Sequence, residues 1–540
     1  MATERMTKRS EAKWLMAIIA LGVAIFASTL QAGFTFDDAH SVRGHVGVHG
    51  PLSFRNIFLR DYWGFAFEET AGSWRPVATL SYWVDWHVGG GAPWVFHVTN
   101  LICWAVLLLL VHVFLSQWLR DALPQRIRLI IVAAFASMAV HIDVVPTATG
   151  RTELLAMGFS LAALIVVLRP QKPLRAGAIL ASGLFLVLAL FSKESAFPMA
   201  LVVPWMAWRF HRRSDSFDFR YLAGLAGLSF SVLAGAITLR AGKLPFVMAT
   251  PGILSDNPIH GMPWLDQKLA SAEVLTHYIQ HAVTGLDLVP DYSYSAIHVL
   301  QNGFSVRTAI GTGLLVALTA LALRFHRCRP HITDAVLGFA GSYLVASHLV
   351  VPASAMVADR LFFFPSFWLV LIGALLFDQI PRVNPARGSG RLGARRIVAV
   401  GALAWIVVQA VIATAAATVW RDDAVLLTQA IQTYPHVART RANLAQVLAF
   451  AGRNEEAAWN VLLAHAYYAR FPRPIPDHEF PLHWDDLPMA DRVHALRLQE
   501  GELLFFDAID RSINTCAEWK LDAPAAILKD WRTKAGFQNH

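Results

Sequence analysis

Two adjacent carboxylates, Asp37 and Asp38, follow shortly after the first apolar stretch of the chain, residues 14–30. Two like charges at the edge of a low-dielectric region are costly to keep, so a purely structural role rarely requires both. A carboxylate in this position can act as a general base that accepts the proton of a hydroxyl group. Two alternatives stay open from the residues alone. One is a site for a divalent cation such as Mg²⁺ or Mn²⁺, and the other is a solvated loop pair or a helix cap before Ala39.

Basic side chains that could bind a phosphate group lie near later apolar stretches, on the same side as these carboxylates: Arg75, Arg151, Lys193 and Arg360. Arg matches a phosphate with two parallel hydrogen bonds, and Lys supplies a point charge. The alternative for three of them is a structural ion pair with a neighbour in sequence. Those pairs would be Lys193–Glu194, Arg151–Glu153 and Asp359–Arg360. We favour Arg360 and Lys193 as the phosphate ligands.

The composition indicates a membrane protein with many crossings. The 540 residues are 55% hydrophobic and only 16% charged, whereas about a quarter of the residues are charged in a soluble domain. The net charge of +8 is therefore interpreted through the loops and not as a signal for nucleic-acid binding. We expect an all-α fold with about eleven transmembrane helices. The expected spans are residues 14–30, 94–115, 127–141, 154–168, 176–191, 196–210, 221–239, 309–323, 335–351, 361–377 and 397–419.

The first span is kept as a transmembrane helix, because no convincing cleavage pattern of a signal peptide follows it. Arg and Lys residues concentrate in alternate loops, which the positive-inside rule places in the cytoplasm. An odd number of crossings then puts the C-terminus and two long loops, 33–93 and 240–304, outside. In these loops, residues 75–90 suggest an amphipathic interfacial helix and residues 274–289 a re-entrant or interfacial piece. The three cysteines show no spacing typical of a metal site or a disulfide framework.

After Trp420 the composition becomes that of a soluble domain. The segment ANLAQVLAFAGRNEEAAWNVLLAHA, residues 442–466, has Leu, Ala and Gly at offsets typical of a tetratricopeptide repeat. A half repeat, residues 422–435, precedes it. We therefore divide the chain into a membrane domain, residues 1–419, and an outer tetratricopeptide-like helical domain, residues 420–540. So short an array should lean on the membrane domain or on its own last helices, since fewer than about three repeats rarely stand alone.

Several motifs occur in a fixed order along the membrane domain. They are FTFDD (34–38), IFLRDYWG (57–64), WRPVATLSYWVDWHVGGGAPWVFHVTNL (74–101), HIDVVPTATGRTELLA (141–156), SKES (192–195), DNP (256–258), LDLVPDYSYSAI (286–297) and VPASAMVADRLFFFPS (351–366). Together with the repeat-like tail, they resemble the transmembrane and tetratricopeptide-repeat O-mannosyltransferases. That family belongs to the C-type glycosyltransferases, and the resemblance spans about residues 34–464.

The resemblance implies a polyprenyl-phosphate sugar as donor and one inverting displacement by the acceptor hydroxyl. It implies that an acid of the first outer loop is the base. We expect this base to be Asp38, with Asp37 orienting the site or holding a partner Arg. Contacts with substrate are expected from His97, His141, Glu194 and Asp291. No cofactor is firmly expected, and a metal at Asp37 and Asp38 is an alternative.

The function expected from these observations is transfer of a mannose-like sugar to Ser or Thr hydroxyls of proteins outside the cytoplasm. The repeat-like tail favours a protein acceptor, because repeats offer concave surfaces for extended peptides. Alternatives are a lipid or glycan acceptor, a transporter, and a non-catalytic scaffold. Charges that gather at the outer edge argue against transport. The short tail and the lack of a retention signal favour a bacterial inner membrane over the endoplasmic reticulum.

Overall fold

The structure is a computed structural model of the whole chain, and most residues can be described in it. The described residues are 7–67, 73–169, 175–212, 218–241, 256–297, 299, 303–350, 352–380, 390–471, 487–500 and 502–537. In these ranges the chain forms helices and no β-strand, so the predicted all-α class is confirmed.

Each of the expected spans contains a helix. These helices are α1 (Lys8–Ile25), α5 (Pro93–Trp118), α6 (Gln125–Ser137), α7 (Arg151–Val167), α8 (Ala176–Leu190), α9 (Met199–His211), α10 (Phe219–Ala241), α13 (Val306–Phe325), α14 (Pro330–Tyr343), α15 (Phe363–Asp378) and α16 (Gly390–Val419). Five segments in the described ranges are long and apolar enough to cross a membrane: Pro93–Trp118, Phe219–Ala241, Val306–Phe325, Asp359–Asp378 and Arg395–Val419. The presence of several such helices agrees with a membrane protein, and the number of eleven crossings stays a prediction.

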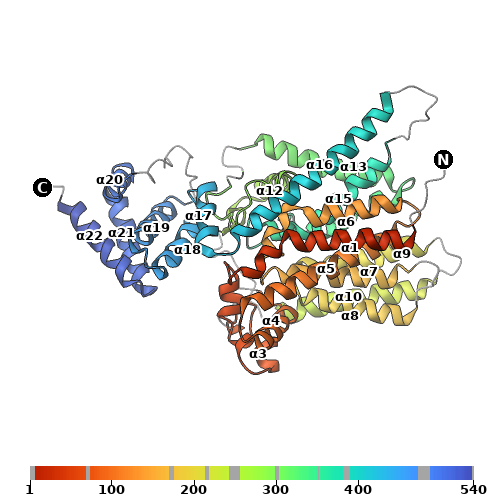
Figure 1. Ribbon diagram of the computed structural model, residues 1–540, viewed down its shortest axis with the longest axis horizontal. Coiled ribbons are helices and arrows are strands. Elements are labelled where there is room, and N and C mark those ends of the chain that lie inside the picture. Colours follow the sequence, from red (N-terminus) through yellow and green to blue (C-terminus); the bar gives the residue numbers. More distant parts are fainter. Residues whose placement is uncertain are drawn as a thin grey trace.

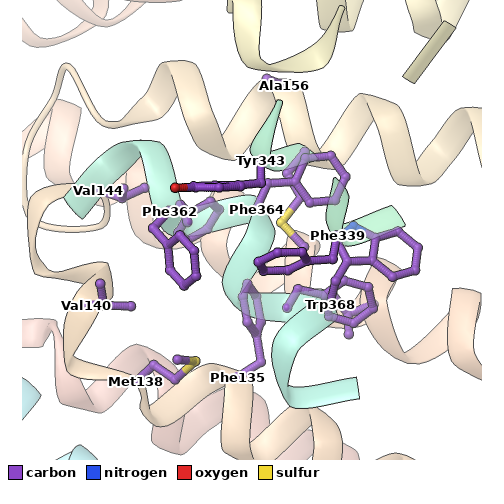
Figure 2. Packing of buried hydrophobic residues seen from close by; sticks show 14 of the residues in the cluster. Phe135, Met138, Val140, Val144, Ala156, Phe339, Tyr343, Phe362, Phe364 and Trp368 are labelled. Atoms are coloured by element: carbon purple, nitrogen blue, oxygen red, sulfur yellow. The ribbon is translucent and has the colours of Figure 1, made fainter. Parts of the chain in front are cut away.

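Aromatic side chains fill the centre of the bundle, where α6, α14 and α15 meet (Figure 2). Phe135, Phe362 and Trp368 are buried there, and Phe339 packs edge-on against Phe362 with ring centroids 6.1 Å apart. Edge-to-face pairs of this kind add to the stabilisation that burial gives. The segment that contains His141 runs along this core as the short helix η4 (Ala139–Asp143). The core therefore fixes one side of the candidate site described below.

The expected interfacial helix exists as α4 (Pro76–Gly89). Pro76 opens it, as is common at the first helical position, and Gly90 ends it in the left-handed conformation. The re-entrant or interfacial character of residues 274–289 stays a prediction. Most of this segment is the second half of one continuous helix, α12 (Trp264–Thr284), which Gly285 ends with a φ of 68°. His277 and His281 lie within this unbroken helix and have partners on adjacent segments, Arg307 and Asp359, whereas Asp287 follows its end.

The C-terminal residues form a lobe at one end of the bundle, opposite the end where the N-terminus lies (Figure 1). Its helices are α17 (Asp423–Thr433), α18 (Ala438–Phe450), α19 (Asn454–Ala469), α20 (Met489–Glu500), α21 (Glu502–Glu518) and α22 (Asp522–Phe537). The sequence prediction of helices around residues 422–466 is confirmed. The assignment of these helices to a tetratricopeptide repeat stays a prediction. We call helices α17–α22 the C-terminal lobe.

Candidate active site

The carboxylates of Asp37 and Asp38 have very different surroundings. Asp38 is fully buried, and its two carboxylate oxygens accept hydrogen bonds from the backbone N–H groups of Ala148 (3.0 Å) and Thr149 (2.8 Å). Burial raises the pKa of Asp38 to about 6, although the two backbone donors act in the opposite direction. Asp38 therefore ties the first loop to the segment before α7.

Asp37 faces Arg360 of the short helix η7 (Asp359–Phe362). The distance between Asp37 Oδ2 and Arg360 Nη2 is 3.3 Å, and the side chains of both residues are 23% exposed. Asp37 and Arg360 thus keep part of their polar surface open, whereas Asp38 does not. A ligand that approaches this edge of the bundle can reach the Asp37 carboxylate and the Arg360 guanidinium together.

Arg360 has a second carboxylate partner that the sequence analysis did not select. Asp143, at the end of η4, lies with Oδ2 3.1 Å from Arg360 Nη1. Burial raises the pKa of Asp143 to about 7, and the neighbouring Asp359 and Asp37 act in the same direction, while Arg360 opposes it. Arg360 is therefore shared between two carboxylates, of which one changes its charge near neutral pH. The sequence signal that could have revealed Asp143 is an acid just after an apolar stretch, residues 127–141.

Lys193 does not pair with its neighbour Glu194. Its ammonium group lies 2.8 Å from Glu153 Oε1, and Ser195 donates a hydrogen bond to the other oxygen of Glu153. The Lys193 side chain is only 4% exposed, and burial lowers its pKa against the effect of Glu153. Lys193 is therefore held in a buried ion pair and offers little surface to a ligand.

Glu194 instead holds two arginines. Its carboxylate is 3.1 Å from Arg75 Nη2 and 2.6 Å from Arg240 Nη1. The Arg75 guanidinium also lies 4.6 Å from the ring centroid of the buried Tyr62, in a cation–π arrangement. In this structure Glu194 is a partner of cations, and the geometry gives it no position against a substrate hydroxyl.

Arg151 is completely buried and its donors are used within the bundle. It forms an ion pair with Asp85 and donates hydrogen bonds to Asn100 Oδ1 (2.8 Å) and the carbonyl oxygen of Phe96 (2.9 Å). An arginine with no exposed surface and three filled directions cannot receive a phosphate without a rearrangement. The geometry therefore supports a structural role for Arg151, in contrast to the phosphate-binding role expected from the sequence.

The alternative ion pairs expected between sequence neighbours do not form. The pairs that form are Arg151–Asp85, Lys193–Glu153, Arg75–Glu194 and Arg360–Asp143, and Asp359 binds His281 at 2.8 Å. The physical reason is that side chains one or two positions apart on a helix point in different directions. Residues on separate elements face each other instead.

Two histidines expected to contact substrate are buried. His97 lies 3.2 Å from the carbonyl oxygen of Gly33, so it anchors the start of the loop that carries Asp37. His141 is enclosed by the rings of Trp104, Phe135 and Phe363, and its Nε2 is 3.1 Å from Ser366 Oγ. Neither imidazole has exposed surface in this structure, so both support the site from behind.

Asp291 joins the bundle to the C-terminal lobe. Its Oδ2 accepts hydrogen bonds from Arg439 Nε and Thr440 Oγ1, both at 3.2 Å, at the start of α18. Arg439 also pairs with Asp256 at 3.0 Å. In this structure Asp291 links the bundle to the C-terminal lobe, and its contact with a sugar stays a prediction. Sequence patterns do not reveal this link, because the partners are separated by more than a hundred residues.

The geometry offers the Asp37–Asp38 pair no joint metal site. Asp38 is occupied by backbone donors and Asp37 by Arg360. Among the described residues, no group of three or more His, Cys, Asp or Glu side chains could hold a metal ion together. We therefore derive no step through a metal.

Several curated proteins that are similar in sequence to this chain carry the name protein O-mannosyl-transferase. The chain is 27% identical over 378 residues to the Caenorhabditis elegans "Protein O-mannosyl-transferase F38B6.6", an alignment that covers 68% of this chain and 51% of that protein. It is 32% identical over 197 residues to the Drosophila melanogaster "Protein O-mannosyl-transferase Tmtc2", which covers 34% and 20% of the two chains. It is 22% identical over 398 residues to the Mus musculus "Protein O-mannosyl-transferase TMTC3", which covers 68% and 42%.

The chain thus spans about half, or less, of the length of these curated relatives. No family model matches the chain. The similarity to several protein O-mannosyl-transferases nevertheless confirms the resemblance inferred from the sequence motifs.

Proposed function

We propose that this chain, a relative of the protein O-mannosyl-transferases, is an integral-membrane glycosyltransferase. In this proposal it transfers a mannose-like sugar from a polyprenyl-phosphate carrier to Ser or Thr hydroxyls of proteins outside the cytoplasm. The observation that carries the proposal is the contact between Asp37 and Arg360, each 23% exposed, at the edge of a helical bundle. A base and a phosphate ligand side by side are the two groups that this reaction requires.

The reaction is one displacement at the anomeric carbon of the sugar. The Asp37 carboxylate accepts the proton of the acceptor hydroxyl as its oxygen forms the new glycosidic bond. The bond between the anomeric carbon and the phosphate oxygen breaks, and the polyprenyl phosphate leaves with the bonding electrons. Arg360 stabilises the charge that develops on the departing phosphate. The configuration of the sugar is inverted.

The role of base is proposed for Asp37, although the sequence analysis favoured Asp38. A base must come within hydrogen-bond distance of the hydroxyl group that it deprotonates. Both oxygens of Asp38 are taken by backbone N–H groups in a fully buried position, whereas part of Asp37 is exposed. We therefore propose that Asp38 positions the loop on which Asp37 acts.

The proposal also includes three expectations from the sequence. They are the eleven crossings of a C-type glycosyltransferase, the tetratricopeptide-like character of the C-terminal lobe, and the outer location of the site and lobe. The charge distribution among the loops supports this orientation. The polyprenyl donor fits an enzyme whose phosphate ligand lies at the end of an apolar segment, Asp359–Asp378.

Sugar transfer in membranes supplied with radiolabelled polyprenyl-phosphate mannose tests the proposal. Wild type would be compared with Asp37→Asn, Asp38→Asn and Arg360→Lys at matched protein levels. Label moving into protein with wild type but not with Asp37→Asn supports the assignment. Full transfer by Asp37→Asn removes Asp37 from the chemistry. Label in lipid and none in protein would favour the alternative acceptor class.

A further inference from the structure

A cavity of about 480 Å³ lies between the bundle and the C-terminal lobe, and we call it the joint cavity. One wall comes from α12, from the loop that follows it and from the first turn of α13. The other wall comes from the end of α17 and the following residues, 432–436. A ligand of moderate size would thus touch both parts of the molecule at once.

The lining is polar and carries both signs of charge. The bundle contributes the imidazole of His281, the carboxylate of Asp287 and the guanidinium of Arg307, and the lobe contributes the amide of Gln432. A lining that mixes hydrogen-bond donors, acceptors and charges of both signs favours neither a strongly charged ligand nor an apolar one. They match a neutral ligand rich in hydrogen-bonding groups, such as the backbone and hydroxyls of a polypeptide segment.

Two residues of the lining have strained backbones. Asp287 has a φ of 60° and Ser295 a φ of 76°, and only five non-glycine residues in the described ranges have positive φ. The Ser295 hydroxyl is also buried and has no hydrogen-bond partner in the part of the chain that the structure describes. Strain and an unsatisfied buried hydroxyl both cost free energy, and both are typical of ligand sites.

The joint cavity is connected to the candidate active site by one carboxylate. Asp359 accepts a hydrogen bond from Tyr292 (2.6 Å) and lies 2.8 Å from Nδ1 of His281, which lines the cavity. The next residue, Arg360, is the one that pairs with Asp37. The cavity is thus linked to the proposed phosphate ligand through the imidazole of His281 and the carboxylate of Asp359.

We propose that the joint cavity binds a segment of the acceptor polypeptide next to the Ser or Thr that receives the sugar. This inference rests on the function proposed above, and it names the place where the acceptor is held. The polyprenyl tail of the donor is a poor match, because the walls are polar. The lobe contributes one wall of the cavity, residues 432–436, so its position at the end of the bundle gives it a direct part in acceptor binding.

The test compares two exposed glutamines of α17, three residues apart. Gln432 lines the joint cavity and Gln429 does not, so Gln432→Trp fills the cavity while Gln429→Trp is the matched control. The purified full chain of each variant would be titrated with a fluorescent pool of synthetic Ser- and Thr-containing peptides, and thermal melting would verify that both variants are folded. We expect Gln432→Trp to weaken peptide binding by about tenfold or more, the effect of losing one or two hydrogen bonds together with space.

Weaker binding by Gln432→Trp than by Gln429→Trp supports the inference. Equal binding by the two variants, or no binding of the peptides by wild type, overturns it. Because this readout needs no catalysis, failure of the proposed function gives a different result: wild type would bind the peptides but transfer no sugar to them.

Discussion

The Asp423 carboxylate of the C-terminal lobe accepts a hydrogen bond of 2.7 Å from the backbone N–H of Phe36, the residue before Asp37. Phe36 has a left-handed backbone, with a φ of 51°. For a residue with a Cβ this conformation costs about 1–2 kcal/mol, so it requires support from its surroundings. A second contact is the hydrogen bond from Gly33 N–H to the carbonyl oxygen of Arg421, at 3.2 Å. The loop with the proposed base thus rests on the start of the lobe.

Removing the Asp423 carboxylate should therefore lower the rate of transfer. We expect Asp423→Ala to reduce kcat by about tenfold or more, since small misplacements of a reacting group are costly. Asp423→Asn keeps an oxygen that can accept the Phe36 N–H and should recover most of the rate. The measurement is the initial rate of sugar transfer at saturating donor.

The adjacent carboxylate provides the control for this experiment. Asp422 caps the N-terminus of α17 by accepting hydrogen bonds from the N–H groups of Ala424 and Val425. Asp422→Ala should cost about 1 kcal/mol of helix stability without touching Phe36. If Asp422→Ala slows transfer as much as Asp423→Ala does, Asp423 acts on the stability of the lobe and not on the position of the loop.

The two carboxylates of the first loop should differ in their effect on stability. Asp38→Asn replaces one of two acceptor oxygens with an amide N–H₂, which then faces a backbone donor in a buried position. The expected loss is about 1–3 kcal/mol, seen as a lower Tm of the purified protein in detergent. Asp37→Asn should leave the Tm almost unchanged, because its side chain and its ion pair with Arg360 are partly exposed. An unchanged Tm for Asp38→Asn would contradict the buried position of this carboxylate.

Binding of the donor should weaken as the pH rises through about 7. Below that value Asp143, whose pKa burial raises to about 7, is neutral, and Arg360 is then shared only with Asp37. Above it Asp143 is an anion and competes with the donor phosphate for Arg360, while Asp359 and Lys193 keep their own partners. The donor is a phosphodiester and has no proton to lose in this range. We expect the KM for donor to rise from pH 6 to pH 8 by about threefold to tenfold.

Asp143→Asn should remove this dependence. The amide keeps the shape of the side chain but stays neutral at every pH, so the KM for donor should be low and flat over the same range. A slope that persists in Asp143→Asn would assign the titration to another group.

The helices were more predictable than the contacts among their side chains. Every expected apolar span contains a helix, because a long apolar run has few alternatives in a bundle of this kind. The positions of Asp37 and Arg360 near the ends of expected spans also followed from the sequence. Their contact did not, because it depends on how the loop that carries Asp37 packs against η7. Neighbours in sequence predicted the wrong ion pairs for Lys193 and Arg151, since adjacent residues diverge.

The sequence predicted a C-terminal helical domain on the same side as the carboxylates, but not the contacts that it makes with the bundle. Asp423 and Asp291 are ordinary loop and cap residues by type, and their partners lie 387 and 149 positions away. Periodicity identifies the helices of the lobe and says nothing about which end of the bundle they cover. Only the three-dimensional arrangement brings Phe36 to Asp423 and closes the joint cavity.

Mutations that affect Arg151 and Arg360 should have different consequences, because only Arg360 is proposed to bind the donor phosphate. Asp85→Ala leaves the buried Arg151 guanidinium without its anion, and breaking a buried pair in this way costs about 3–5 kcal/mol. We expect a marked loss of folded protein, measured by size exclusion and thermal melting in detergent. Arg360→Lys should behave in the opposite way, with a nearly unchanged Tm and a higher KM for donor, because a lysine cannot bind a phosphate with two parallel hydrogen bonds. Normal folding of Asp85→Ala together with a raised KM for donor would show instead that Arg151 turns toward the phosphate.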